Sequence, residues 1–440
     1  MVLLPVLLWM QASLGFAQSG QFLEIQSFGE APGLSGVNIH DIWQDRVGYL
    51  WVATSEGLLR YDGYTFKPFR HVPGDSTSIG HNSVMKILED KNGDLWLGLG
   101  RGGVSRYDRA AGRFCNYPFT RKLKPSTAPV TGLFFDRAGR LWAGVAYNGV
   151  VQLDVKTGSF KQFDLVTAEN SPHLNAEDLS AYNTGYRFYQ DEQGKLWVTN
   201  PGDFYVFDPE TGTARPWRPL KKLPAGAFFA EQASCILPDG ELLWTGGWES
   251  GLRSINRKTG ERRQFFFYPE NVPAPGKNIV YDLTAKSLNE IWIGTHDRGL
   301  GIFNKKTEQF FWFADHPEQV IGGLPPQVVG GIVPDNQGNS WAAADGKLVR
   351  MRLKDRHFRR HEVAADRKQS FIVSQLLEDR ERRFFFIGTQ YADGLHVVEK
   401  KTGKEQVLGF YAPPMESGAL LVMDLLQARD GKIWVLTHHS

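Results

Sequence analysis

Aromatic side chains that stand beside charged ones are the residues of this chain best suited to contact a ligand. Trp248 precedes Glu249, and His296, Asp297 and Arg298 follow one another. A flat ring can cover the apolar face of a sugar, while carboxylates and guanidinium groups form hydrogen bonds with its hydroxyls. The sequence therefore predicts a carbohydrate-binding surface. The residues assigned to it are Arg101, Tyr147, Asn148, Trp248, Glu249, His296, Asp297 and Arg298.

Two other interpretations of these polar residues stay open. Asn148-Gly149, Asp345-Gly346 and Asp393-Gly394 are dipeptides typical of tight turns, which would explain them without a ligand. Glu249 and Asp297 could instead pair as the acid and base of a glycosidase. Nothing in the surrounding sequence supports this catalytic interpretation.

The sequence lacks the common signatures of cofactor and metal sites. His357 and His361 are four residues apart, but they lie in a stretch that reads as strand and turn, so helical metal-ligand spacing does not apply. No Gly-rich phosphate loop, Gly-x-Ser-x-Gly elbow or Cys–His cluster occurs. We therefore expect no cofactor, no metal and no catalytic residue in this chain.

The candidate residues must be positioned by a repeated unit, whose clearest copy is Asp90–Gly98. Most copies combine an Asp or Asn, a turn that usually contains Gly, and a Trp. The seven tryptophans are Trp51, Trp96, Trp142, Trp197, Trp244, Trp292 and Trp341. Their spacing averages about 48 residues, a period typical of repeated structural units. Two further copies follow, one with Phe386 in place of Trp and one at Asp430–Trp434.

Each repeat contains four short strand signals. An apolar first strand precedes the Asp, as in Val84–Leu88, and the second strand around the Trp is apolar at successive positions, which is typical of a strand buried on both faces. A third strand follows a Gly, as in Gly103–Asp108, and the fourth is aromatic, as in Phe160–Phe163. The predicted fold class is all-β, a seven-bladed β-propeller of four-stranded antiparallel blades.

Residues 21–28 resemble a fourth strand that has no blade of its own. We expect them to complete the seventh blade and so to close a propeller over residues 18–353. Residues 354–440 would begin a second propeller, with its first two blades present. Because two blades cannot close a ring and an open strand edge favours aggregation, we expect the sequence to be a fragment of a longer protein.

The turn pattern divides the loops between two faces of the propeller. The Asp-x-x-Gly turns and the Thr-Gly turns are two strands apart, so they share one face. The links between blades, and those between second and third strands, fall on the other face and vary in length, as in Thr120–Pro129 and Asp164–Gly185. This second face is called the variable face below. Variable loops on a rigid scaffold commonly carry recognition, and all the candidate residues lie in such loops.

Charge, cysteine content and the N-terminus narrow the class of function. The 440 residues include 50 Lys and Arg against 48 Asp and Glu, a net charge of +2, so we expect no nucleic-acid partner.

Cys115 and Cys235 are predicted to lie in distant blades, unpaired and buried. Residues 1–17 form an apolar run that ends in Leu14-Gly15-Phe16-Ala17, typical of a secretory signal peptide although it lacks an initial Lys or Arg.

The repeat resembles that of the two-component regulator propeller family. Leu50–Thr54 reads Leu-Trp-Val-Ala-Thr and Gly57–Gly63 reads Gly-Leu-Leu-Arg-Tyr-Asp-Gly, and the resemblance extends over residues 21–440. It implies the periplasmic sensor region of a membrane-spanning hybrid histidine kinase that detects carbohydrate fragments. The partners it implies are an oligosaccharide and the membrane-anchored kinase of the same full-length chain, with a homodimer left open.

Two functions of other classes stay open at this stage. One is an extracellular propeller enzyme, a glycosidase or polysaccharide lyase, and the other is a non-catalytic scaffold that presents surfaces to proteins. An assay for cleaved product separates an enzyme from a sensor, because a sensor leaves its ligand intact.

Overall fold

The computed structural model of the chain describes most of the residues after the N-terminal segment. The described residues are 21–101, 103–119, 128–170, 187–199, 204–217, 235–247, 250–268, 277–323, 329–355, 372–390, 395–400, 402, 404–408 and 420–439. The chain divides into two compact units, Met1–Asp355 and Arg356–Ser440. The predicted signal peptide, residues 1–17, lies outside the described residues. None of the described helices is long and apolar enough to cross a membrane.

The first unit is a β-propeller, as the sequence predicts. Its first six blades each contain four strands that pair in sequence order, with antiparallel register. Blades 1 and 2 are β2 (Ile39–Gln44), β3 (Leu50–Thr54), β4 (Gly57–Tyr61), β5 (Phe66–Phe69), and β6 (Val84–Glu89), β7 (Leu95–Leu99), β8 (Gly103–Asp108), β9 (Arg113–Pro118). Blades 3 and 4 are β10 (Val130–Phe135), β11 (Leu141–Val145), β12 (Val150–Leu153), β13 (Phe160–Phe163), and β14 (Phe188–Gln190), β15 (Leu196–Thr199), β16 (Phe204–Asp208), β17 (Thr213–Pro216). Blades 5 and 6 are β18 (Cys235–Asp239), β19 (Leu242–Gly246), β20 (Leu252–Asn256), β21 (Arg262–Phe265), and β22 (Val280–Ala285), β23 (Glu290–Thr295), β24 (Leu300–Asn304), β25 (Gln309–Trp312).

The seventh blade draws strands from both ends of the unit. Its own strands are β27 (Val329–Pro334), β28 (Ser340–Ala344) and β29 (Lys347–Asp355). The N-terminal strand β1 (Gln21–Ser27) pairs antiparallel with β29 along its whole length. The short 3-10 helices η2 (Phe313–Asp315) and η3 (Pro317–Gln319) precede β26 (Val320–Ile321), which adds to the outer edge of β1 in parallel. The sheet order is therefore β26-β1-β29-β28-β27.

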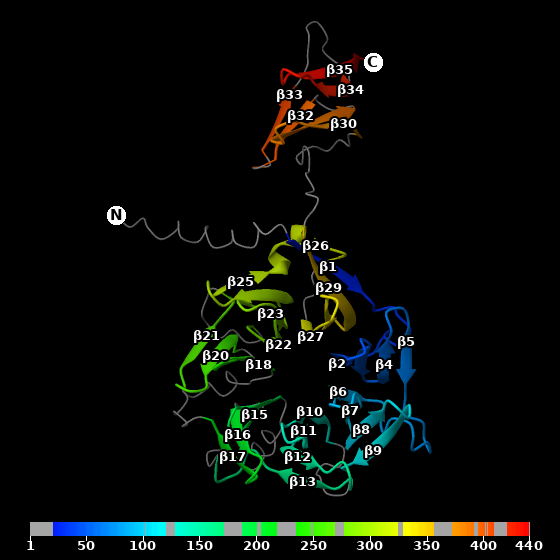
Figure 1. The fold of residues 1–440 in the computed structure, drawn as a ribbon, viewed down its shortest axis with the longest axis vertical. Helices are drawn as coiled ribbons and strands as arrows, with labels where there is room; N and C mark the ends of the chain where they lie inside the picture. Colours follow the sequence, from blue (N-terminus) through cyan, green and yellow to red (C-terminus); the bar gives the residue numbers. More distant parts are fainter. Residues whose placement is uncertain are drawn as a thin grey trace, which may run out of the picture. The chain divides into compact units, whose positions relative to one another are not determined.

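The first strands of the blades form a closed ring around the centre of the unit (Figure 1). Each first strand contacts the first strand of the next blade, in the order β2, β6, β10, β14, β18, β22 and β27, and β27 contacts β2. The fourth strands lie at the rim. Because consecutive turns of a blade alternate between its two ends, this arrangement places the turns between second and third strands on the variable face.

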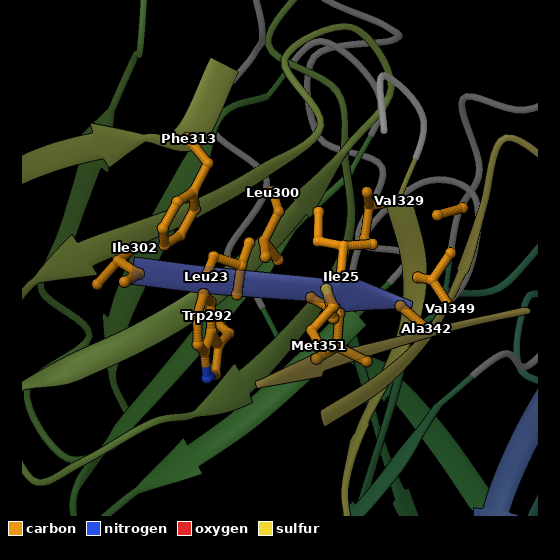
Figure 2. Close-up of a cluster of buried hydrophobic side chains, with 12 residues drawn as sticks. Leu23, Ile25, Trp292, Leu300, Ile302, Phe313, Val329, Ala342, Val349 and Met351 are labelled. Carbon is orange, nitrogen blue, oxygen red and sulfur yellow. The ribbon is translucent and has the colours of Figure 1, made fainter. Parts of the chain in front are cut away.

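Side chains of β1 fill a core between blades 6 and 7 (Figure 2). Leu23 and Ile25 are buried in one cluster with Trp292 of blade 6 and Met351 of blade 7. Figure 2 shows Leu23 and Ile25 among these apolar side chains, with Leu23 next to Trp292 and Ile25 next to Met351. The strand therefore joins the first and last parts of the unit by apolar packing as well as by its backbone hydrogen bonds.

The Asp-x-x-Gly turn is explained by the hydrogen bonds of its Asp. In blade 1 the Oδ1 atom of Asp45 accepts bonds from the backbone N–H groups of Val47, Gly48 and Tyr49 at 3.0, 2.9 and 2.9 Å. Gly48 has a φ of 104°, a conformation that side chains other than glycine rarely adopt. The residue types of the motif are thus those that this tight turn requires.

The second carboxylate oxygen of the same Asp explains why a Trp recurs in the following strand. It accepts a hydrogen bond from the indole Nε1 of the Trp in the following strand, in six of the seven blades. The pairs are Asp45–Trp51 at 2.7 Å, Asp90–Trp96 at 3.1 Å, Asp136–Trp142 at 2.9 Å, Asp191–Trp197 at 2.9 Å, Asp239–Trp244 at 3.0 Å and Asp335–Trp341 at 2.9 Å. Blade 6 has no such Asp, and there the Lys286 ammonium group lies 6.0 Å from the Trp292 ring centre.

The second unit contains the two later copies of the repeat. β30 (Ile372–Glu378), β31 (Phe384–Gln390), β32 (Leu395–Glu399) and β33 (Glu405–Leu408) form a four-stranded sheet. β34 (Leu420–Gln427) and β35 (Ile433–His439) form a separate pair. Asp379 keeps its turn bonds, accepting from the N–H groups of Arg383 and Phe384.

The cysteines agree with the sequence prediction only in part. Neither Cys115 nor Cys235 forms a disulfide. Cys235 is buried, but Cys115 is half-buried, so the prediction that both are buried is wrong for Cys115. Cys115 lies in β9, the outermost strand of its blade, where one face of the strand is open to solvent.

Candidate functional site

A cavity of about 510 Å³ on the variable face of blades 1 and 2 contains one of the predicted residues, Arg101. Arg101 follows β7 in the turn toward β8. The other polar side chains of its wall include His71, His81 and Asn116, and Tyr117 supplies an aromatic ring. The volume lies within the range of about 300–1,000 Å³ that is usual for small-molecule sites.

The two imidazoles of this cavity are held in opposite tautomers. Nδ1 of His71 lies 2.8 Å from the carbonyl oxygen of Ile79, which can only accept, so neutral His71 leaves Nε2 as an acceptor. Nδ1 of His81 accepts from the backbone N–H of Ser83 at 3.0 Å, so neutral His81 leaves Nε2–H as a donor. The cavity wall therefore offers both kinds of hydrogen-bonding group, which suits hydroxyls because they donate and accept.

Charge and burial keep His81 neutral. Burial lowers the pKa of His81, and the nearby charge of Arg101 lowers it further. Arg101 is therefore the cation of this pair, while His81 serves as a neutral donor.

Asn116 fixes the loop that forms one wall of the cavity. Its Nδ2 donates to the carbonyl oxygen of Ser78 at 2.9 Å, and its Oδ1 accepts from the Ser105 hydroxyl at 2.5 Å. The same hydroxyl accepts from the N–H of Gly80 at 3.1 Å. These bonds join the connection between blades 1 and 2 to strands β8 and β9, so the wall is formed before any ligand arrives.

His296, Asp297 and Arg298 form a second polar cluster on the variable face, in blade 6. The Tyr281 hydroxyl lies 2.7 Å from Nδ1 of His296, and the Tyr268 hydroxyl donates to Oδ2 of Asp297. Burial, and then this bond to Asp297, raise the pKa of Tyr268 to about 12. Tyr268 therefore remains a hydrogen-bond donor at neutral pH.

The guanidinium of Arg298 binds other side chains of the propeller. Its Nη2 donates to both carboxylate oxygens of Asp315, at 2.7 and 2.6 Å, and its guanidinium lies 5.2 Å from the Trp312 ring centre. In contrast, Oδ1 of Asp297 is buried and has no hydrogen-bond partner among the described residues. A buried acceptor without a donor is costly, so a ligand hydroxyl at this oxygen would be stabilising.

The remaining predicted residues differ in accessibility. Tyr147 is 50% exposed and has a φ of 64°, so it projects from the turn between β11 and β12. Asn148 is only 3% exposed, and its Nδ2 donates to the carbonyl oxygen of Ala146 at 2.8 Å. That bond favours the turn interpretation for Asn148. Trp248 and Glu249 lie outside the described residues.

The predicted residues thus belong to separate blades rather than to one site. Arg101 is in blade 2, Tyr147 and Asn148 in blade 3, and His296 to Arg298 in blade 6. Sequence reasoning did not identify His71 and His81, although their loop is a link between blades and so belongs to the variable face. Among the described residues, no group of three or more His, Cys, Asp or Glu side chains is arranged to hold a metal ion.

Comparison with known proteins identifies the repeats. Residues 78–101, which run from the wall of the Arg101 cavity through β6 and β7 to Arg101 itself, match the family described as Two component regulator propeller. Over 63 residues the chain is 49% identical to Histidine kinase P4 of Formosa agariphila, a match that covers 14% of this chain and 4% of that protein. The repeat at residues 78–101 is thus similar to that of the two-component regulator propeller family.

Solved structures share the propeller fold of this chain at low sequence identity. The extracellular domain of BT3049 from B. thetaiotaomicron, described as a hybrid two component system, aligns with a TM-score of 0.67 and 21% identity, covering 94% of this chain and 52% of that one. A streptogramin B lyase aligns with a TM-score of 0.56 and 16% identity over 76% of this chain and 98% of that one. PorZ, a surface component of the type-IX secretion system of Porphyromonas gingivalis, aligns with a TM-score of 0.55 and 14% identity, covering 91% of this chain and 59% of that one.

These matches differ in how much of each relative they cover. The chain spans about half of the BT3049 domain and a small part of the Formosa kinase. The structural alignments are evidence for the propeller fold, since their identities are low.

Proposed function

We propose that this two-component regulator propeller is the ligand-sensing region of an exported sensor kinase, that it works in the periplasm, and that it binds carbohydrate fragments at the Arg101 cavity. The observation that carries the proposal is this 510 Å³ cavity on the variable face, lined by a cation, an imidazole donor, an imidazole acceptor and the Tyr117 ring. Sugar hydroxyls need both donors and acceptors, and an aromatic ring can cover the apolar face of a sugar.

Two further observations support a sensor rather than an enzyme. Asp297 accepts a hydrogen bond from the Tyr268 hydroxyl, so its carboxylate already interacts within the blade. One of the matched relatives is a histidine kinase, and the signalling module of such a kinase would lie outside a propeller such as this one. The signal-like residues 1–17 agree with export.

Titration calorimetry of the chain against a panel of glycan oligomers tests this proposal. We expect saturable binding of at least one oligomer, and Arg101→Gln should weaken it at least tenfold because the cavity loses its cation. Arg113→Gln is the matched control, since Arg113 is an exposed arginine at the start of β9 that does not line the cavity. No binding across a broad panel, or equal binding by the Arg101 variant, would overturn the assignment.

An assay for new reducing ends or unsaturated products, run on any oligomer that binds, distinguishes a sensor from an enzyme. A sensor leaves the oligomer intact after prolonged incubation. Cleavage at a rate proportional to protein concentration would instead assign the chain to the glycosidase or lyase class.

A further inference from the structure

One position of the repeat places a residue at the same level of the central channel in every blade. It is the residue of the first strand that faces the second residue after the Trp, as Asp41 faces Ala53 and Lys86 faces Gly98. We call these seven residues the channel ring. They are Asp41, Lys86, Gly132, Arg187, Cys235, Asp282 and Gly330.

Four members of the channel ring are charged. Asp41, Lys86, Arg187 and Asp282 line one cavity of about 250 Å³, together with neighbouring residues of the first strands. This cavity shares no lining residue with the Arg101 cavity. It is a second place, independent of the proposed function, where the fold collects polar groups around a space.

The two carboxylates of the channel ring each bind a backbone N–H group of the next blade. Oδ2 of Asp41 accepts from the backbone N–H of Ile87 in the next blade at 3.0 Å, and Oδ2 of Asp282 accepts from that of Ile332 at 2.6 Å. Both bonds join one first strand to the next across a blade boundary. A carboxylate at these two positions is therefore accounted for by the stability of the ring.

The two cations of the ring are not accounted for in the same way. Lys86 forms a long ion pair with Asp41, in which Nζ lies 3.7 Å from Oδ1, although the Lys86 side chain is only 16% exposed. No described carboxylate lies within salt-bridge distance of the guanidinium of Arg187, which forms no side-chain hydrogen bond with the described residues, although its charge acts on Asp282. Burying a cation with only distant partners is costly.

The two cations also act on each other. Burial lowers the pKa of Lys86 to about 8, and the charge of Arg187 is the next largest cause. The charged groups that face Lys86 are Arg187, Asp41 and Asp282. Gly132, the ring residue of the blade between Lys86 and Arg187, contributes no side chain that could fill the space between them.

These contacts place two cations beside one small cavity. We propose that the channel ring binds a small hydroxylated organic carboxylate, whose carboxylate lies between Lys86 and Arg187. The fork of the Arg187 guanidinium fits two carboxylate oxygens, and the oxygens of Asp41 and Asp282 that face the cavity accept from ligand hydroxyls. A cavity of about 250 Å³ lies just below the usual range for small-molecule sites, which favours a small ligand such as a single sugar acid.

Calorimetry of the full chain with D-glucuronate and D-gluconate, at constant ionic strength, tests the proposal, with D-glucose as the neutral control. We expect saturable binding of at least one carboxylate and none of glucose. Lys86→Met and Arg187→Met should each weaken the binding at least tenfold. Lys67→Met removes an exposed lysine from β5, far from the first strands, and should leave the affinity unchanged.

A measurement on the unaltered chain covers the case in which these variants fail to fold. An anion beside Lys86 raises its proton affinity, so carboxylate binding at pH 8 should take up protons, which calorimetry in buffers of different ionisation enthalpy detects. Absence of saturable binding by both carboxylates, equal binding of glucose, unchanged affinity in folded Lys86 and Arg187 variants, or binding without proton uptake would each overturn the proposal.

Discussion

The indole Nε1 of Trp51 donates a hydrogen bond of 2.7 Å to Oδ2 of Asp45, and both side chains are fully buried. The other oxygen of Asp45 holds the turn, so one carboxylate fixes both the turn and the strand that follows it. Arg109 of blade 2 also reaches Oδ2 of Asp45, at 2.9 Å, which extends the link to the neighbouring blade. The spacing of Asp and Trp in the repeat follows from this geometry.

Asp45→Ala should lower the free energy of unfolding by about 3 kcal/mol, since it leaves the buried Trp51 N–H and the Arg109 guanidinium without their acceptor. Chemical denaturation measures this change. Asp62→Ala, in the exposed second turn of the same blade, should have a clearly smaller effect because no indole bonds to Asp62.

A double-mutant cycle of Asp45→Ala and Trp51→Phe isolates the bond itself, with an expected coupling of about 1–3 kcal/mol. Additive effects of the two substitutions would show that Asp45 acts through the turn alone.

The closing strand provides the second prediction. Leu23→Ala should cost about 2–5 kcal/mol, because Leu23 is fully buried between blades 6 and 7. Gln26→Ala, on an exposed position of the same strand, should stay within about 0.5 kcal/mol. Deleting residues 21–28 should be more severe than Leu23→Ala, because it removes every backbone bond to β29. Thermal unfolding of the deletion variant like that of the unaltered chain would show that the ring closes without β1.

The fold could be predicted from the sequence because each blade is specified by local features. The Asp turn, the apolar second strand and the third strand after Gly recur with little change, and each is fixed within one repeat. The addition of β26 to the edge of β1 was not predictable, since a strand as short as Val320–Ile321 has no periodic pattern of its own. Its pairing depends on a long-range contact.

The site could be predicted less well, because loops on one face do not reveal which of them meet. Arg101 was found from its place in a loop between second and third strands. His71 and His81 lie in a link between blades, and only the fold brings them to Arg101. The channel ring could not be predicted either, since its members differ in type from blade to blade and no motif marks them.

The third prediction concerns pH. The pKa of His81 is lowered in the folded chain, so the unfolded chain binds its proton more readily. This contribution to stability is complete above the usual histidine pKa of about 6.5, and it is lost as the pH falls from there through the lower pKa of the folded state.

Unfolding free energies at pH 7.5 and 5.5 should therefore differ less in His81→Asn than in the unaltered chain. Asn keeps an acceptor for the Ser83 N–H, and the other titrating groups are common to both proteins. The same difference in both proteins would show that His81 contributes no pH dependence.

The last prediction compares two tryptophans within blade 5. Trp244 is 4% exposed, donates to Asp239 at 3.0 Å and packs 5.5 Å from the ring centre of Phe303, so Trp244→Ala should cost about 3–5 kcal/mol. Trp248 comes between β19 and β20 in the sequence, outside the repeating core pattern. Trp248→Ala should therefore leave the free energy of unfolding nearly unchanged. Chemical denaturation of both variants measures the two changes. If Trp248→Ala destabilised the chain as much as Trp244→Ala does, Trp248 would belong to the core, because only a buried ring leaves a cavity of that cost when it is removed.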